Sequence, residues 1–164
     1  MQPNYFGMIL HNPYNHLPGY NCFGCSDKNP IGLKLEFEKN DDTVSAQWTP
    51  THDYQGWNNV LHGGIIATLL DEISFWALQT FLETSGVTSE LNVKYLKPVH
   101  IDSGTITVTA KIKEKVTEHQ YAFDAKLFDG RGILCAEGNV VYFVYPQAIA
   151  KTKFHYPGKE AFGL

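Results

Sequence analysis

A long apolar stretch begins after one histidine and two glycines. Over residues 65–78 apolar side chains fall on nearly every helical face, and neither glycine nor proline returns before Gly86. A helix that is apolar all round is one that the rest of the protein surrounds. The pattern therefore predicts a buried central helix that begins at Gly63 or Gly64 and ends near Thr84.

Alternating apolar and polar residues predict strands on both sides of this helix. Leu33, Leu35 and Phe37 alternate with charged residues, which is the period of a half-buried strand. We expect that strand over residues 31–39 and, after a turn at residues 40–42, a second strand over residues 43–49. Three or four long strands are expected after the helix, over residues 88–97, 104–116, 119–128 and 132–145.

The order of these elements predicts an α+β fold in which one helix is wrapped by a curved antiparallel sheet, without βαβ alternation. The domain is expected over residues 31–145, after an irregular arm (1–30) and before a polar tail (146–164). A length of 164 residues suits one domain. A single sheet on one helix leaves an edge strand exposed, and a homodimer that continues the sheet across a two-fold axis is the expected way to cover it.

Composition and charge limit the kinds of partner and the cell compartment to be expected for this protein. A net charge of −4 and a pI near 5.9 argue against a nucleic-acid-binding surface, which would need clustered Lys and Arg. Three cysteines cannot form a full disulfide framework, so a reducing, cytoplasmic location is expected. The start of the chain does not match a secretory signal, and two acids interrupt the apolar helix, so no membrane association is expected.

Two of the cysteines have the spacing of half a zinc site. Cys22 and Cys25 form a Cys-x-x-Cys pair, but Cys135 stands alone and no paired histidines follow at zinc-finger spacing. His11 and His16 could complete a site in principle. The expectation is a loop that packs two small thiols, with no metal and no cofactor.

Two acids in the middle of the predicted helix conflict with its apolar surroundings. Asp71 and Glu72 lie past the first turn and cannot cap the helix, and an ionised carboxylate there is costly unless it is paired, coordinated or used. The helix N-terminus offers free N–H groups and a partial positive charge, and Gly63 and Gly64 let a ligand approach them. Such an N-terminus suits the carbonyl oxygen of an ester or thioester, while a carboxylate in the same cavity activates water or attacks.

Each of these features also has a purely structural interpretation. The glycines can form a tight entry turn, and His62 can be a satisfied loop histidine. Asp71 can be locked in an ion pair, and Glu72 can point to solvent. As a set on one segment, they favour function. The motifs of serine hydrolases, phosphate-binding loops and dinucleotide-binding domains are missing, and nothing local marks Cys22 or Cys25 as an activated nucleophile.

Two further segments complete a resemblance to a known family. The His62-Gly63-Gly64 segment with Asp71, followed by Glu90-Leu91-Asn92-Val93-Lys94-Tyr95-Leu96-Lys97-Pro98, resembles the hotdog-fold acyl-CoA thioesterases of the phenylacetate-pathway (PaaI-like) and THEM-like group. Cys22-Phe23-Gly24-Cys25 with Asn29-Pro30-Ile31-Gly32-Leu33 is similar to a segment that opens many members. The resemblance covers about residues 20–145.

The resemblance implies catalytic roles. The backbone N–H of Gly63 would polarise the thioester carbonyl, and Asp71 would come from the opposite subunit as base or nucleophile. Thr88 would help to place the water, with Ser89 beside it. His62 would shape the helix entry more than transfer protons.

The resemblance also implies contacts with the substrate. The strand around Tyr95 would line the route by which CoA leaves, with Lys97 as a partner for a phosphate. Some members carry Asn six residues before the histidine, where this chain has Gly56, and Gln55 could substitute. Asn59 stands where the family often has Gly, and Asn tolerates left-handed backbone. The expected substrate-binding residues are Gly64, Gln55, Asn59, Ser89, Tyr95 and Lys97.

The expected function is hydrolysis of acyl-CoA thioesters by a homodimer or homotetramer whose active site lies at the subunit interface. A non-catalytic hotdog module that binds acyl thioesters is one alternative. A hydratase or dehydratase, in which His62 would pair with the acid, is another. The sequence leaves open the acyl group and the choice between CoA and a carrier protein as the thiol partner.

Overall fold

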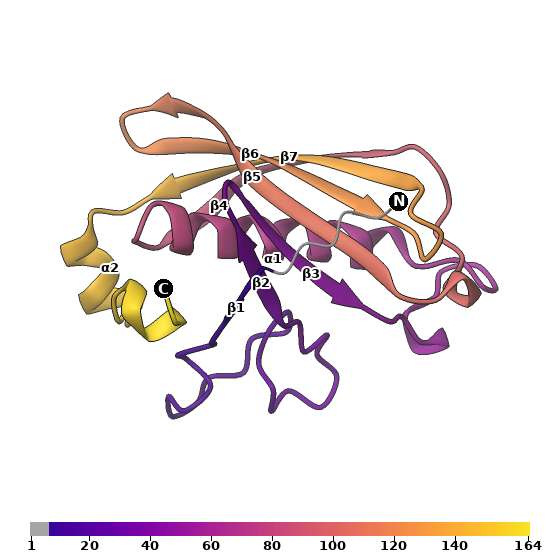
Figure 1. Cartoon of the computed structure of the whole chain (residues 1–164), viewed down its shortest axis with the longest axis horizontal. Coiled ribbons are helices and arrows are strands. Elements are labelled where there is room, and N and C mark those ends of the chain that lie inside the picture. Colours follow the sequence, from indigo (N-terminus) through magenta and orange to yellow (C-terminus); the bar gives the residue numbers. More distant parts are fainter. Residues whose placement is uncertain (1–6) are drawn as a thin grey trace.

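The computed structural model describes residues 7–164 of the chain. Its central element is the helix α1 (Gly63–Phe81), which lies against one curved antiparallel sheet (Figure 1). The strands are β1 (Met8–Leu10), β2 (Phe37–Asn40), β3 (Thr43–Trp48), β4 (Gly86–Tyr95), β5 (Ile106–Thr117), β6 (Gln120–Phe128) and β7 (Leu134–Val144), in the sheet order β1-β2-β3-β5-β6-β7-β4. A second helix, α2 (Gln147–Lys153), and three short 3-10 helices (His52–Tyr54, Ile101–Ser103 and Lys159–Phe162) complete the fold.

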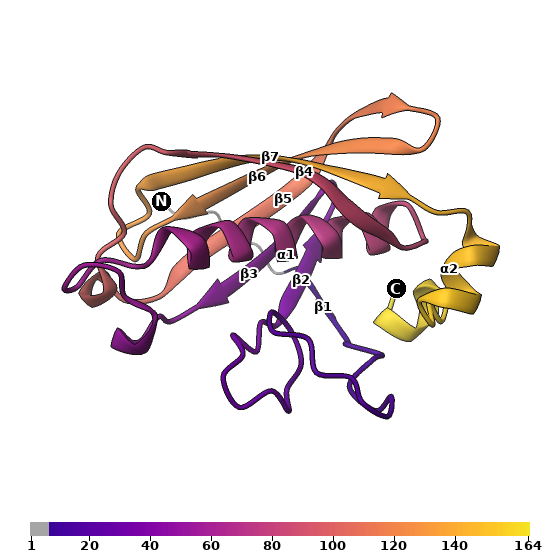
Figure 2. The same ribbon diagram turned by 180° about the vertical axis from the view of Figure 1, so that it is seen from behind.

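The prediction of a surrounded central helix is confirmed. Leu69 and Ile73 are completely buried, and the ring of Trp76 stacks on Phe37 of β2 with 4.1 Å between centroids. The view from behind shows α1 running along the face of the sheet, with the N-terminal segment (residues 7–36) below it (Figure 2). No helix within residues 7–164 has the length and apolarity to cross a membrane.

The first predicted strand is wrong over most of its length, because β2 begins only at Phe37. Leu33 and Leu35 are buried, as their alternation indicated. Their N–H groups, however, donate to the carbonyl oxygens of Phe23 and Gly24, in the loop before them, at 2.8 and 3.0 Å. The alternation thus reflects burial of side chains on an irregular segment. The other predicted strands are present, and none of their bounds is shifted by more than two residues.

Both ends of the chain contribute to the packing. In the N-terminal segment, Met8–Leu10 pairs with β2 as the first strand of the sheet. Near the C-terminus, Phe162 is completely buried and its ring meets Trp76 of α1 edge to face at 5.7 Å. The central helix also ends at Phe81, earlier than expected, and Glu83 just beyond it has left-handed backbone with φ 53°.

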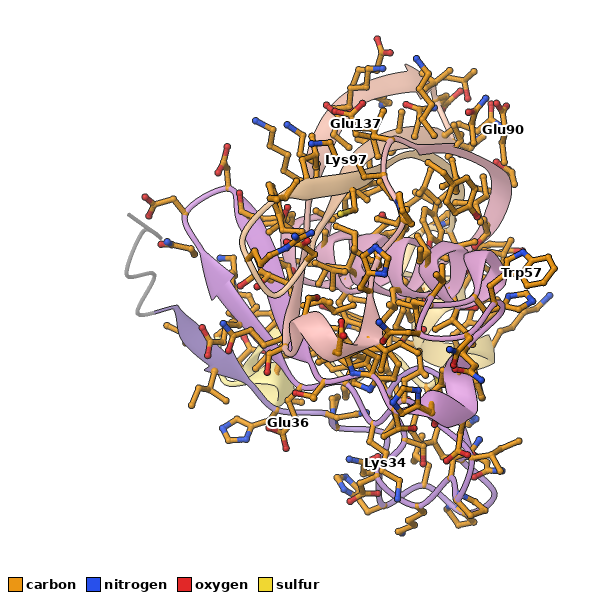
Figure 3. All side chains as sticks on the ribbon, turned by 90° about the vertical axis from the view of Figure 1, so that its right-hand side faces the viewer. Lys34, Glu36, Trp57, Glu90, Lys97 and Glu137 are labelled. Carbon is orange, nitrogen blue, oxygen red and sulfur yellow. The ribbon has the colours of Figure 1, made fainter. Side chains whose placement is uncertain are left out.

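Strand β4 forms the edge of the sheet opposite β1 and is hydrogen-bonded on one side only, to β7. Nearly all of its residues are exposed. Glu90 lies at the surface on this strand and Lys97 lies just beyond its end (Figure 3). Large apolar side chains are exposed along the same segment: Val87, Leu91, Tyr95 and Leu96.

Candidate active site

One backbone N–H group at the N-terminus of α1 is free to donate a hydrogen bond. His62 caps the helix: its ring Nδ1 accepts the Gly64 N–H at 2.9 Å, and its carbonyl oxygen accepts the N–H groups of Ile65 and Ile66 at 3.0 and 3.1 Å. The Gly63 N–H has no acceptor among residues 7–164. It therefore offers a hydrogen bond at the positive end of the helix dipole.

The capping hydrogen bond also fixes the tautomer of the neutral His62 ring. Because Nδ1 accepts a hydrogen bond, the proton of the neutral imidazole is on Nε2. The ring is exposed and remains a donor toward solvent or a ligand. The structural contribution of His62 is thus to hold the glycine turn at the start of α1.

Tyr95 of β4 closes the other side of this turn. Its hydroxyl donates to the carbonyl oxygen of Gly63 at 2.7 Å. A Cβ added to Gly63 would lie 3.5 Å from the Tyr95 ring. The first residue of α1 is therefore held between its own cap and the edge strand.

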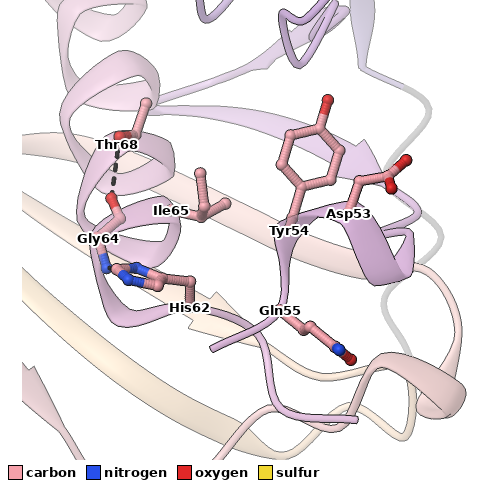
Figure 4. A pocket seen from close by; sticks show the side chains of 7 residues that line it. All are labelled: Asp53, Tyr54, Gln55, His62, Gly64, Ile65 and Thr68. Atoms are coloured by element: carbon pink, nitrogen blue, oxygen red, sulfur yellow. Dashed lines mark hydrogen bonds between the residues drawn. The ribbon is translucent and has the colours of Figure 1, made fainter. Parts of the chain in front are cut away.

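An open hollow of about 410 Å³ lies beside the cap (Figure 4). In Figure 4, His62 and Gly64 on the helix side face Tyr54 and Gln55 of the preceding loop. Its volume lies within the range of small-molecule sites. The Gln55 Oε1 accepts the Asn59 N–H at 3.2 Å, which leaves its amide nitrogen as a donor. The lining residues are Asp53, Tyr54, Gln55, His62, Gly64, Ile65 and Thr68.

Two hydroxyl groups converge on one carboxylate oxygen of Asp71. Thr88 of β4 donates to Asp71 Oδ1 at 2.8 Å, and the hydroxyl of Tyr142 on β7 lies 2.7 Å from the same Oδ1 and 2.7 Å from the Asp71 carbonyl oxygen. Asp71 Oδ2 has no hydrogen-bond partner in the described part of the chain. Two donors orient the carboxylate, and one of its oxygens stays free to take a proton.

Tyr142 was not predicted as a site residue. It is 1% exposed, and burial, followed by the nearby charge of Asp71, raises the pKa of its phenol well above the usual value. The hydroxyl therefore stays protonated and can donate. Alternation along 132–145 could indicate that Tyr142 faces the helix, but no local motif marks its contact with Asp71, which lies 71 residues earlier in the chain.

The carboxylate and the free N–H lie far apart along the same helix. Asp71 follows Gly63 by eight residues, which at about 1.5 Å per residue corresponds to about 12 Å. Asp71 is not among the residues that line the hollow. The chain thus forms two separate groups: Gly63 with its cap, and Asp71 with its hydroxyls.

Two of the other predicted site residues, Asn59 and Ser89, have structural partners. Asn59 has left-handed backbone with φ 61°, and its Oδ1 accepts the Asp102 N–H at 3.0 Å. The Ser89 hydroxyl donates to the carbonyl oxygen of Val141 at 3.0 Å, where β4 bulges. Lys97 is exposed.

Glu72 does not point to solvent, and Asp71 is not in an ion pair within residues 7–164. The Glu72 carboxylate faces the N-terminal loop: its Oε1 accepts the indole N–H of Trp76 at 3.2 Å and lies 3.7 Å from the Cys22 sulfur. Burial, followed by the neighbouring Cys22, raises the pKa of Glu72 to about 8. The two adjacent acids therefore have different surroundings.

Comparison with known proteins supports the fold. The sequence profile described as "Thioesterase superfamily" matches residues 58–136, which include all of α1 and β4. A protein of Saccharolobus solfataricus that is provisionally named as an esterase is 28% identical over 123 residues, which are 74% of this chain and 80% of that protein.

Solved structures of other proteins share this fold. A thioesterase from Haemophilus influenzae has a TM-score of 0.66 at 22% identity, covering 75% of this chain and 86% of that chain. A Bacillus halodurans protein, solved with CoA, has a TM-score of 0.62 at 26% identity, covering 71% of this chain and 77% of that chain. The chain therefore has the hotdog fold, and its residues 58–136 are similar to the thioesterase superfamily.

Proposed function

We propose that this protein hydrolyses acyl-CoA thioesters to the free acid and CoA. The observation that carries the proposal is the Asp71 carboxylate, whose Oδ1 is held by Thr88 and Tyr142 while Oδ2 is free. The free N–H of Gly63 supplies the second element that thioester hydrolysis needs. The CoA bound in the similar Bacillus halodurans structure supports CoA as the thiol partner.

The two groups suit the chemistry of a thioester. The Gly63 N–H donates to the carbonyl oxygen and stabilises the negative charge that develops there. Asp71 Oδ2 removes a proton from the attacking water or attacks the carbonyl carbon itself. The departing thiolate needs no strong general acid, so one carboxylate and one oxyanion donor are sufficient.

A complete site requires two copies of the chain. The separation of about 12 Å between Gly63 and Asp71 prevents both from acting on one carbonyl carbon within a protomer. Pairing of two β4 edges across a two-fold axis would cover the exposed Leu91 and Tyr95. The proposal is a homodimer in which Asp71 of one protomer acts beside Gly63 of the other; a tetramer and a cytoplasmic location stay predictions.

Binding of CoA would use the region where β4 ends. Lys97 is exposed there and can pair with a phosphate group. Tyr95 is half exposed and lies against the turn at Gly63. These residues would guide the CoA away from the reacting carbonyl.

The first test is thiol release from short, aromatic and long acyl-CoA esters by the wild type and Asp71→Asn. The Asn side chain keeps the size of Asp71 and can still accept from Thr88, so the fold is preserved. Loss of the base should lower kcat by about 10²–10⁴. Unchanged turnover in the variant would remove Asp71 from the mechanism.

A mixing experiment tests the composite site. Asp71→Asn and Gly63→Pro should each lose about 10²-fold or more in activity when tested alone. After unfolding and refolding together in equal amounts, half of the dimers contain one chain of each kind, and one of their two sites is intact. The pool should therefore regain about one quarter of the wild-type activity. Absence of recovery in a pool with confirmed mixed dimers would contradict a shared site.

Two alternatives predict other outcomes of the same assays. A binding module would bind acyl-CoA without releasing thiol. A hydratase would add water to a 2-enoyl thioester without releasing thiol, with His62 acting beside Asp71.

A further inference from the structure

Three side chains that ligate metals meet where the N-terminal segment packs on α1. The sulfur of Cys22 lies 3.3 Å from the sulfur of Cys25 and 3.7 and 3.8 Å from the two carboxylate oxygens of Glu72. One donor atom from each of the three residues lies within 4.8 Å of the others. The cluster has no part in the site proposed above.

These distances are close to those of a tetrahedral zinc site. Zinc–sulfur bonds of about 2.3 Å and zinc–oxygen bonds of about 2.0 Å place two sulfurs about 3.8 Å apart, and sulfur and oxygen about 3.5 Å apart. The observed separations of 3.3 Å between sulfurs and 3.7 Å between sulfur and oxygen differ from these by a few tenths of an ångström to half an ångström. Small side-chain rotations would admit the ion.

The loop is built to receive the Glu72 carboxylate. A Cβ on Gly24, between the two cysteines, would lie 2.5 Å from the carboxyl carbon and from Oε2 of Glu72. A larger residue at position 24 would therefore displace the Glu72 carboxylate from this place. The indole N–H of Trp76 orients the same carboxylate, as partners of metal ligands do.

The charges of the cluster favour a cation. Neither of the two ion pairs found within residues 7–164 involves Glu72. The cluster thus brings two sulfur atoms beside a buried carboxyl group that has no cationic partner in the described part of the chain, an arrangement that a divalent ion would stabilise.

We propose that Cys22, Cys25 and Glu72 bind one zinc ion that fastens the N-terminal segment to the central helix. Two thiolates with one carboxylate suit a borderline-soft ion such as Zn²⁺ better than Mg²⁺ or Ca²⁺. Water would fill the fourth position, because Cys22 is only half-buried. The hydroxyl of Tyr20, 3.0 Å from the Cys25 sulfur, can donate a hydrogen bond to that ligand.

This inference replaces the expectation that no metal is bound. Sequence spacing could not reveal the third ligand, because Glu72 comes from the middle of α1 and lies 50 residues after Cys22. His11 and His16, the ligands considered from sequence, are exposed and absent from the cluster. The ion would have a structural role and would fix the helix beside Asp71.

Metal analysis by mass spectrometry tests the site. The protein is expressed with added zinc and purified without chelator. One equivalent of zinc per chain is expected for the wild type, and close to none for Cys22→Ser and Glu72→Gln. The matched control is Cys135→Ser, which removes a buried thiol outside the cluster and should keep one equivalent.

A second measurement keeps the test valid if a variant fails to fold. Cobalt added to metal-free wild type should give the visible absorption bands of a thiolate-bound tetrahedral ion, and zinc should displace them. Zinc should also raise the Tm of metal-free wild type and of Cys135→Ser, but not that of Cys22→Ser. Wild type that binds neither ion, or that carries a Cys22–Cys25 disulfide in place of zinc, would overturn the proposal.

Discussion

Replacing Gly63 with proline would remove one hydrogen-bond donor and leave the helix entry in place. Gly63 is the first residue of α1, where proline is tolerated because the N–H that it lacks has no intrahelical acceptor there. His62 already has a ψ of 133°, the extended conformation that a residue before proline adopts. A Cβ at position 63 would meet Tyr95 at 3.5 Å, an ordinary van der Waals contact.

The expected cost follows from the role of the donor. Removing one preorganised oxyanion donor costs about 2.7–4 kcal/mol of transition-state stabilisation, which corresponds to about 10²–10³ in kcat. Because charge on the carbonyl oxygen develops mainly in the transition state, kcat should fall while KM changes little. Thermal unfolding should show that Gly63→Pro keeps the fold.

The matched control is Gly63→Ala, which adds the same Cβ beside Tyr95 but keeps the N–H. Thiol release from an acyl-CoA that the wild type hydrolyses gives kcat and KM for all three proteins. The alanine variant should stay within about threefold of the wild type, since a small change without special contacts costs about 0.5 kcal/mol. Equal kcat values for the proline and alanine variants would refute the role of this N–H.

Four further changes test other parts of the structure. Tyr142→Phe removes a hydrogen bond to the carboxylate and should lower kcat by about 10–100-fold without raising KM; an equal loss in Tyr156→Phe, a buried tyrosine elsewhere, would make the effect nonspecific. A Cβ at position 56 would lie 3.7 Å from the His62 ring, so Gly56→Asn adds an amide donor beside that ring. This variant should raise kcat by about 2–10-fold. An unchanged kcat would show that this donor is not needed. Phe162→Ala should cost about 3–5 kcal/mol of unfolding free energy in urea, because the ring is completely buried; a loss below about 1 kcal/mol would mean that the C-terminal segment is dispensable. Leu91→Lys, on the exposed edge strand, should produce monomers by light scattering, together with loss of thiol release; an active monomer would contradict the shared site.

The central helix was predictable because the apolar pattern that indicates it lies within one continuous stretch of sequence. Apolar residues on all faces require a surrounding protein, whichever elements provide it. The strand expected at Leu33 and Leu35 failed because alternation reports which side chains are buried and not where the backbone hydrogen bonds go. Those bonds connect to Phe23 and Gly24, a loop whose path no periodic pattern describes.

The candidate site residues also divide into those that a local motif marks and those that depend on contacts between distant parts of the chain. The glycine turn and Asp71 could be singled out as candidates because they lie on one segment with a motif. Tyr142 and the environment of Glu72 were not found, because each depends on a contact between distant parts of the chain. Long-range contacts of this kind follow from the topology of the sheet and the path of the N-terminal loop, which the sequence pattern leaves undetermined.

The two acids on α1 show how one helix can serve two purposes. Successive residues on a helix point about 100° apart, so Asp71 faces the hydroxyls of Thr88 and Tyr142 while Glu72 faces the loop with the two cysteines. The same helix separates Asp71 from the free N–H at its own start by about 12 Å. Two such helices related by a two-fold axis and running in opposite directions would place each Asp71 beside the other's N-terminus. The exposed edge strand β4 is where that two-fold axis would join the sheets, and each dimer would then contain two equivalent sites.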